Sequence, residues 1–213
     1  MHRIITIAAS YGAGGSIVAP AVADALGIRF LDRALHRRGT SALEEAAALL
    51  ARGEAATEEE RTGGRWTRIF EAFARMPSDP NESGAVPVVV VGADERLREQ
   101  AEARLREFVE GGDGVVLGWA GSVVIGGAYH VRLDGPLEDR LRQGMAIGGE
   151  RDEAAARRQL AETDRVRAQY WRRLYRREWD DLTPYHLVID STALGLDVVT
   201  ELIATAARAH WQR

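Results

Sequence analysis

The sequence predicts an α/β three-layer sandwich built on a five-stranded parallel sheet. Short apolar segments rich in Val and Ile alternate along the chain with longer segments of helical pattern. This alternation is typical of a parallel sheet covered by helices on both faces. In addition, the first apolar segment runs directly into a glycine-rich turn and then a helix. We therefore expect right-handed crossovers and a ligand site at the carboxyl ends of the strands.

The strands are expected at residues 3–8, 28–31, 115–117, 129–133 and 186–189. Helices are expected at residues 17–26, 42–52, 66–75, 93–109, 137–142, 154–177 and 195–211. A surface loop is expected at 77–84, and the run at 88–91 is too short for periodicity to decide its structure. The last helix is expected to face the core with the stripe Val198, Val199, Leu202, Ile203 and Ala206.

Composition limits the functions that the chain can have. The formal net charge of −4 argues against a general nucleic-acid binder, because no overall positive field collects phosphates. The absence of cysteine excludes disulfides, thiolate catalysis and cysteine metal sites. The first strand begins without a basic and apolar leader, and no apolar run reaches membrane-spanning length. We therefore expect one cytoplasmic domain, 1–213, without nucleic-acid or membrane partners; a homo-oligomer is compatible with the sequence.

The turn after the first strand has the layout of a phosphate-binding P-loop: strand, glycine-rich turn, hydroxyl residue and helix. Glycines let successive backbone N–H groups turn inward and form an anion nest, and the helix adds its positive N-terminal end. The residues expected to bind phosphates are Gly12, Ala13, Gly14, Gly15 and Ser16. The alternative is a tight strand-to-helix turn that needs glycine only for its backbone shape.

The loop departs from the usual P-loop pattern at two positions. Gly15 stands where the pattern has its lysine, and Ala9 stands where it has its first glycine. The chain contains no lysine, so all 28 of its basic residues are arginine. A phosphate bound here must therefore be held by backbone amides and arginine. Ser16 would be the hydroxyl that meets Mg²⁺.

Several short motifs, taken in order, resemble the cytidylate kinase-like family, whose members are related to P-loop nucleoside monophosphate kinases. The likeness begins with Ile5-Thr6-Ile7, Tyr11-Gly12-Ala13-Gly14-Gly15 and Phe30-Leu31-Asp32-Arg33. It continues at 115–118, 131–133, 135–140, 164–170 and 185–192. The likeness therefore spans nearly the whole chain, and residues 38–84 match poorly. The Gly-Gly in place of the P-loop lysine is itself frequent in these relatives.

The resemblance implies a P-loop nucleoside triphosphate hydrolase-like kinase core with two helical additions. An insertion at about 34–112 would bind the acceptor nucleotide, and an arginine-rich lid at about 151–177 would close over the transferred phosphoryl group. ATP would be the phosphoryl donor, with Mg²⁺ as cofactor. Such transfers depend on positioning and on neutralising the charge of the γ-phosphoryl oxygens. Closure would also exclude water as a competing acceptor.

Two neighbouring residues at the end of the second strand are candidates for the site. Asp32 is the carboxylate best placed to contact Mg²⁺ through water or to organise the site; a helix N-cap is its alternative role. Arg33 is a candidate for binding the acceptor phosphate, although a solvent-facing arginine is the commoner outcome.

Arginines supply the remaining candidates, because the planar guanidinium binds phosphate with two hydrogen bonds and stays charged. In the lid segment, the spacing of Arg158 and Arg167 about Asp164 follows the family's pattern, so these two are expected to be catalytic. The other lid arginines are expected to pair with acidic neighbours at the surface. Arg140 is expected to flank the adenine or the phosphates; its alternative is an ordinary surface residue. Tyr170 and Trp171 are expected to be packing residues.

One departure affects the acceptor site. Where the relatives have Gly-Arg after the third strand, contacting the acceptor, this chain reads Gly118-Trp119-Ala120. Because an indole cannot neutralise a phosphate, the acceptor site is either rebuilt from other arginines or lost. The sequence therefore supports two functions. One is phosphoryl transfer from ATP to a nucleoside monophosphate, CMP or dCMP first, or to a similar small acceptor. The other is a non-catalytic nucleotide-binding or regulatory module.

Overall fold

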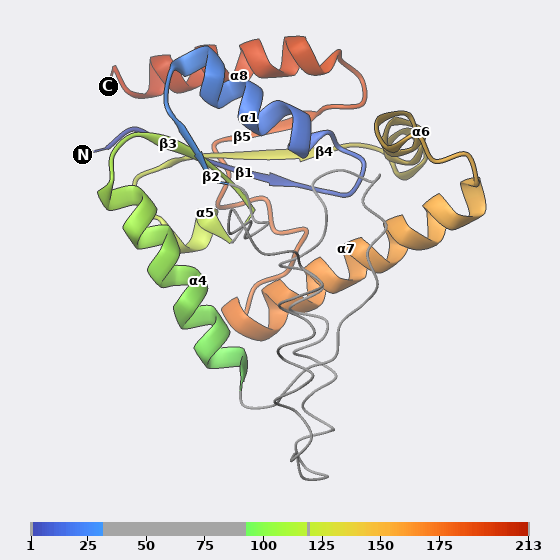
Figure 1. Cartoon of the computed structure of the whole chain (residues 1–213), viewed down its shortest axis with the longest axis horizontal. Helices are drawn as coiled ribbons and strands as arrows, with labels where there is room; N and C mark the ends of the chain where they lie inside the picture. The colour runs from blue at the N-terminus through green and yellow to red at the C-terminus, as the bar shows by residue number, and fades with distance from the viewer. Residues whose placement is uncertain (1, 32–92, 119, 213) are drawn as a thin grey trace, which may run out of the picture.

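The chain forms the five-stranded parallel sheet that the sequence predicts (Figure 1). The computed structural model describes residues 2–31, 93–118 and 120–212. The strands are β1 (Ile4–Ala9), β2 (Arg29–Leu31), β3 (Gly114–Leu117), β4 (Tyr129–Asp134) and β5 (Leu187–Asp190). Their order is β2-β3-β1-β4-β5, and all neighbouring pairs are parallel. β1 therefore lies at the centre, so the loop that follows it leaves the middle of the sheet's carboxyl edge.

The helices among the described residues are α1 (Gly15–Leu26), α4 (Ala93–Glu110), α5 (Gly121–Val124), α6 (Leu137–Gly148), α7 (Glu153–Tyr175) and α8 (Leu196–His210). Two of them differ from expectation. α6 continues to Gly148, beyond the predicted end at 142, and Gly149 ends it in the left-handed conformation with φ 65°. The single-turn helix α5 was not predicted, because so short a segment shows no periodicity. None of the described helices is long and apolar enough to cross a bilayer.

Several predicted features lie outside the described residues. They are the helices at 42–52 and 66–75, the loop at 77–84, the run at 88–91, Asp32, Arg33, Trp119 and the side chain of Tyr170. Of the expected acceptor-binding insertion, the described part is its C-terminal end, which contains α4. There Arg106 donates to Glu102 at 2.8 Å, the i,i+4 geometry that stabilises an exposed helix face.

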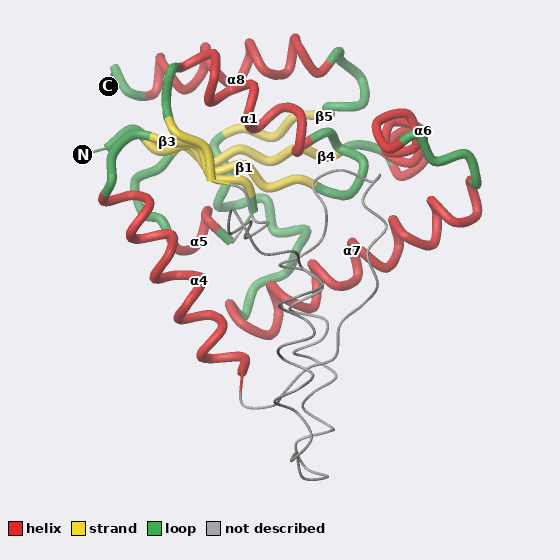
Figure 2. Tube along the Cα trace, viewed as in Figure 1, coloured by secondary structure: helices red, strands yellow, loops and turns green. Residues whose placement is uncertain are grey.

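The sheet has an apolar face covered by α1 and α8, while α4, α5 and α7 lie on the other side (Figures 1 and 2). Because side chains alternate along a strand, Ile5 and Ile7 of β1 share this apolar face with the matching positions of β4. Together with α1 and α8 they form one continuous core, which includes Val18, Val22, Val131, Leu133, Val199 and Ile203. This layer fixes the first strand and first helix, and hence the two ends of the glycine loop.

The core stripe expected on α8 is wrong at two of its five positions. Val199 and Ile203 are buried and Ala206 packs against the core, but Val198 and Leu202 are 43% and 46% exposed. The buried side of α8 lies further round the helix, at Val199, Thr200, Ile203, Ala204 and Ala207. The physical reason is that α1 and the sheet cover only one side of α8, so apolar residues at the edge of the stripe stay in solvent.

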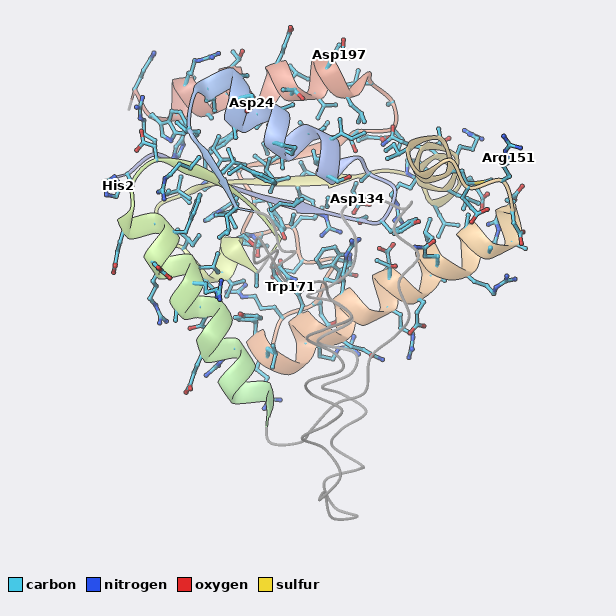
Figure 3. All side chains as sticks on the ribbon, in the orientation of Figure 1. His2, Asp24, Asp134, Arg151, Trp171 and Asp197 are labelled. Atoms are coloured by element: carbon cyan, nitrogen blue, oxygen red, sulfur yellow. The ribbon has the colours of Figure 1, made fainter. Side chains whose placement is uncertain are left out.

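The opposite face of the sheet carries a buried polar layer. The inward positions on this side include Thr6, Ser10, His130 and Arg132, which are 2%, 5%, 7% and 1% exposed. The buried side of α7 consists of Ala156, Leu160, Thr163, Arg167, Trp171 and Leu174. Its Arg167 and Trp171 lie against Thr6 and Ala8 of β1, whereas Ala156 and Leu160 pack against α6 and Tyr11. Figure 3 shows Trp171 between α7 and the sheet, which agrees with its expected packing role. This polar layer leads along β1 and β4 to the glycine loop.

Three neighbouring histidines lie at the amino end of β4, away from the loop. The His130 Nδ1 lies 2.7 Å from the Thr6 Oγ1, and the ring centroids of His130 and His186 are 5.1 Å apart. The ring of His210 is tilted by 48° against that of His186, with the centroids 5.2 Å apart. Burial, with the nearby charges of His186 and His210, lowers the pKa of His130 to about 4. The folded protein therefore keeps this imidazole neutral in mild acid.

We expect the stability to fall as the pH drops from about 6.5 to about 4. Between these pH values His130 is protonated in the unfolded chain but neutral in the folded chain, so lowering the pH favours unfolding. The stabilisation is complete above about pH 6.5, and its loss should reach on the order of 1–2 kcal/mol. Urea unfolding across this window measures the slope, and His130→Asn should make it shallower. An equal slope in both proteins would contradict the assignment.

Candidate functional site

The glycine loop connects β1 to α1 and depends on two left-handed glycines. Gly12 has φ 77° and Gly14 has φ 73°, a backbone conformation that L-residues with a side chain rarely adopt. Gly14 is also the N-cap of α1, so the loop runs directly into the first turn of that helix. The sequence prediction of a strand, a glycine turn and a helix is thus realised in the backbone.

Side-chain donors on α6 and after β5 hold the carbonyl groups of the loop. Arg140 Nη1 donates to the Tyr11 carbonyl at 2.9 Å, and Gln143 Nε2 donates to the Gly12 carbonyl at 2.9 Å. Ser191 Oγ donates to the Ala13 carbonyl at 2.8 Å. Three successive carbonyl groups therefore point toward protein donors, and their oxygens are turned away from any ligand of the loop.

The amide groups of the loop have the complementary arrangement. Among the described residues, no acceptor is found for the N–H groups of Gly12, Gly14, Gly15 and Ser16. The last two belong to the first turn of α1, where no intrahelical acceptor exists. A cluster of N–H groups at the positive end of a helix is the donor set that binds phosphate. The half-buried Ser16 adds a hydroxyl to this first turn.

The position of the missing lysine is closed to any side chain. A Cβ at Gly15 would lie 2.6 Å from the Ala9 Cβ and 3.3 Å from the Leu117 Cδ1. The methyl group of Ala9, at the end of β1, thus occupies the space that a first glycine would leave for a side chain at position 15. The two departures from the P-loop pattern therefore have one steric cause: with alanine at position 9, only glycine fits at position 15.

Arg140 and Asp164 brace the loop from behind. Arg140 is 8% exposed, so the surface alternative for this residue is wrong. Its Nε donates to the Gly135 carbonyl at 3.0 Å, and its Nη1 donates to Asp164 Oδ2 at 2.6 Å as well as to Tyr11. Asp164 Oδ1 accepts from the Tyr11 N–H at 3.0 Å. Together these bonds connect α6 and α7 to one residue of the loop.

The two expected catalytic arginines of α7 occupy different environments. Arg167 is 3% exposed and lies 3.4 Å from Asp164 Oδ1, beneath the sheet. Arg158 is exposed, and no hydrogen bond or ion pair of its side chain is found within the described part of the chain. Arg157 and Arg165 pair with Glu138, Glu153 and Glu162 at the surface, as expected of most arginines in this segment.

Sequence reasoning missed Arg132, the most deeply buried charge at the site. It lies on β4 at 1% exposure, and its Nη2 donates to Ser10 Oγ and to Asp134 Oδ2, both at 2.9 Å. Burial alone would raise the pKa of Asp134, but the charge and hydrogen bonds of Arg132 outweigh it and lower that pKa. The available signal was an arginine within the expected strand 129–133, on the side opposite Val131.

Buried arginines gather near the loop. Three guanidinium groups, those of Arg132, Arg140 and Arg167, face two carboxylates, Asp134 and Asp164, among the described residues. Buried charges are costly when they are not compensated. Guanidinium groups close to a cluster of amide donors suit a site that binds an anion.

Comparison with protein families identifies a match over nearly the whole chain. The model of the cytidylate kinase-like family matches residues 4–193. A cytidylate kinase from Halobacterium salinarum is 29% identical over 125 residues, which cover 55% of this chain. The alignment spans 62% of that kinase, so somewhat under two thirds of its length is matched.

One solved structure supports the fold. The structure of an uncharacterized protein from Eubacterium ventriosum is 17% identical and superposes with a TM-score of 0.61, covering 98% of this chain and 99% of that one. A gluconokinase from Sinorhizobium meliloti, 18% identical, gives a TM-score of 0.46 and covers 98% and 93% of the two chains. At these identities the first likeness concerns the fold alone.

Gly15→Lys is expected to lower the free energy of unfolding by about 1–3 kcal/mol, because the new side chain overpacks against Ala9. Ala9→Gly in the same chain should recover most of this loss. Urea unfolding of both single variants and of the double variant measures the coupling between the two positions. Simple addition of the single effects would show that the Ala9 methyl group does not exclude a side chain at position 15.

Asp164→Ala is expected to destabilise the protein by about 2–4 kcal/mol, because it leaves Arg140 and the Tyr11 N–H without their shared acceptor. Asp164→Asn should cost less, since its amide oxygen can still accept from Tyr11. Glu162→Ala is the matched control: it removes an exposed ion pair on the same helix and should change stability by about 0.5 kcal/mol or less. Equal losses of unfolding free energy in the Asp164→Ala and Glu162→Ala variants would show that Asp164 does not hold the loop through Arg140 and Tyr11.

Proposed function

Since this chain belongs to the cytidylate kinase-like family, we propose that it transfers the γ-phosphoryl group of ATP to a nucleoside monophosphate. CMP and dCMP are the first candidates, because the curated relative is a cytidylate kinase; a similar small phosphate acceptor is the alternative substrate. We also infer that the protein acts in the cytoplasm on free nucleotides, without nucleic-acid or membrane partners, in keeping with its net charge of −4.

The observation that carries this proposal is the orientation of the glycine loop. Three carbonyl groups are bonded to Arg140, Gln143 and Ser191. The amides of Gly12, Gly14, Gly15 and Ser16 are then the groups left to face a ligand, whereas the Ala13 N–H donates to the Ser10 carbonyl at 3.1 Å. Such a preorganised donor set binds phosphate without having to rearrange first. The brace from Asp164 and Arg140 keeps the set in place.

The donor set also fits a magnesium–triphosphate complex. Ser16 would supply the hydroxyl ligand of Mg²⁺, and Asp32, at the end of the second strand, would be the carboxylate held to it through water. Mg²⁺ supplies neutralisation of charge on the phosphate oxygens when it is bound. The chain's own residues orient the donor: the loop amides hold its phosphates, and Arg158 and Arg167 are the cations we assign to the transferred group. Arg140 would act on the phosphates through the loop backbone.

In the proposed reaction the bond from the γ-phosphorus to the bridging oxygen breaks and ADP leaves. An oxygen of the acceptor phosphate forms the new bond to phosphorus. That oxygen is already ionised at neutral pH, so no base is needed to remove a proton. The work of the protein is therefore to align the two substrates and to exclude water. Arg33 and the segment around Trp119 are our candidates for contacting the acceptor.

A non-catalytic nucleotide-binding module is the second candidate. The observation that favours it is the Ala9 methyl group, which closes the position from which a P-loop lysine would reach the phosphates. Both functions require the loop to bind the triphosphate. They differ in whether a cation reaches the transferred group, and so in whether any acceptor is phosphorylated.

Calorimetry with ATP and Mg²⁺, followed by a phosphoryl-transfer screen over CMP, dCMP, UMP and AMP, tests the proposal. Ser16→Ala should weaken Mg²⁺–ATP binding about tenfold, equivalent to about 1.4 kcal/mol. Thr205→Ala, on the exposed side of α8, is the control and should bind normally. No triphosphate binding at millimolar ligand would refute both functions. Binding without transfer to any acceptor would select the module.

A further inference from the structure

The outer side of α8 carries a row of exposed apolar residues. Seven large apolar residues are exposed among those that the structure describes, and three of them lie here: Leu194, Val198 and Leu202, which are 41%, 43% and 46% exposed. Leu194 directly precedes the N-cap Gly195, and the other two follow at intervals of four residues. Single exposed apolar residues are ordinary on a protein surface, whereas a contiguous group of them marks an interaction site.

This row faces solvent in the single chain. Figure 1 shows α8 at the outside of the molecule, with α1 and the sheet on its inner side. α1 runs alongside α8 from one end to the other: Leu196 lies next to Gly14 where both helices begin, and Arg208 donates to the Ala25 carbonyl at 2.9 Å near their ends. In Figure 3, Asp197 points away from the sheet. The outer side of α8 is therefore open along its whole length.

The exposed side of α8 has the spacing of a seam between two helices. Val198, Leu202, Thr205 and Ala209 are all exposed and follow one another at intervals of four, three and four residues. Positions with these intervals face a partner in pairs of packed helices. None of the four side chains carries a charge, so the seam can be covered without burying an ion. The surface therefore fits another helix, and a second copy of α8 is one.

The seam is complementary to itself when the two helices run antiparallel. A two-fold axis through the middle of the seam places Val198 opposite the second copy's Ala209, and Leu202 opposite the second copy's Thr205. Each larger side chain then meets a smaller one, which allows the two helix surfaces to interdigitate. Because such an interface is isologous, each of these contacts occurs twice.

The charges beside the seam favour the same arrangement. Asp197, Glu201 and Arg208 lie along one flank of the seam, and all three are exposed. In the antiparallel pair this flank faces itself, and position 208 of one copy is level with position 199 of the other, midway between Asp197 and Glu201. Arg208 is then attracted by two carboxylates of the second copy. A parallel pair would bring like charges together, so the charges specify the direction of the pairing.

These three charges form no ion pair within the part of the chain that the structure describes. The exposed arginines of α6, of α7 and of the segment just after α7 differ in this respect, because most of them pair with an acidic neighbour: they are Arg142, Arg157, Arg165, Arg172 and Arg177. The bond from Arg208 to the Ala25 carbonyl holds its guanidinium beside the seam. The flank therefore offers charges that a second copy can pair.

We propose that the protein forms a homodimer through α8, with the two α8 helices antiparallel. The inference goes beyond the proposed function and does not depend on it. α8 has 15 residues, or about four turns. One helix face of this length gives an interface at the small end of specific interfaces, so the dimer should dissociate at micromolar concentrations.

Sedimentation equilibrium of the full chain, at concentrations from about 1 to 200 µM, measures the dissociation constant of the dimer. Leu202→Asp should weaken the dimer at least about tenfold, because two carboxylates would be buried in the seam without partners. Its unfolding temperature at low concentration should stay within about 2 °C of the wild type, since Leu202 is exposed in the single chain. Leu137→Asp is the matched control: this leucine of α6 is 47% exposed, and its variant should dimerise normally.

Charge reversal tests the direction of the pairing. Glu201→Arg and Arg208→Glu should each weaken the dimer about threefold or more, because each brings like charges together across the flank. A chain that carries both substitutions should recover most of the affinity, since opposite charges are again adjacent. If the double variant dimerises more weakly than either single variant, the antiparallel arrangement is wrong.

Three other results would overturn the inference. One is a wild-type protein that stays monomeric at about 200 µM, well above the expected dissociation constant. Another is an equal loss of affinity in Leu202→Asp and Leu137→Asp. The third is a monomer that floats with phosphatidylcholine vesicles and ceases to do so with Leu202→Asp, which would assign the seam to a membrane surface. Each of these results leaves the proposed kinase function standing, because nucleotide binding and phosphoryl transfer test it separately.

Discussion

The carboxylate of Asp164 joins the long helix beneath the sheet to the glycine loop, and the candidate site depends on this connection. One oxygen accepts from the Tyr11 N–H, and the other pairs with Arg140, which bonds the Tyr11 carbonyl in turn. Since a buried charge is costly to leave unpaired, the three groups hold one another in a single arrangement. The direction of the loop amides follows from it: with the carbonyl of Tyr11 held behind the loop, the amides that follow are presented on the other side.

The site holds positive charge without a P-loop lysine, and it does so by bringing arginines from three elements. Arg132 comes from β4, Arg140 from α6 and Arg167 from α7. Arginine suits this arrangement because its planar fork can bond two partners at once and never loses its charge. Arg140 uses its nitrogens on the backbone and on Asp164, whereas Arg132 uses only part of its donors. The lysine position itself is filled from the neighbouring strand by the Ala9 methyl group.

The two faces of the sheet bury different kinds of side chain. The face under α1 and α8 is a continuous apolar core and supplies hydrophobic stabilisation. The face over α7 buries arginines, hydroxyls and a histidine, several of them without complete hydrogen bonding. Groups of this kind lower stability, and proteins retain them mainly at functional sites. The hydrophobic stabilisation from the apolar face offsets the cost of burying incompletely hydrogen-bonded polar groups next to the loop.

The sequence by itself determined the parallel sheet, the positions of its strands and the turn between β1 and α1, because each follows from short-range periodicity or composition. It did not determine which side of α8 would be buried, since Val198 and Leu202 differ from Val199 and Ile203 only in what lies opposite them. Nor could the sequence reveal that Asp164 contacts the loop at Tyr11, or that Arg132 is buried against Ser10. Tyr11 and Asp164 are 153 positions apart, and Ser10 and Arg132 are 122 apart. Only the tertiary structure decides such contacts, because the partner that a buried charge finds depends on which elements the folded sheet brings together.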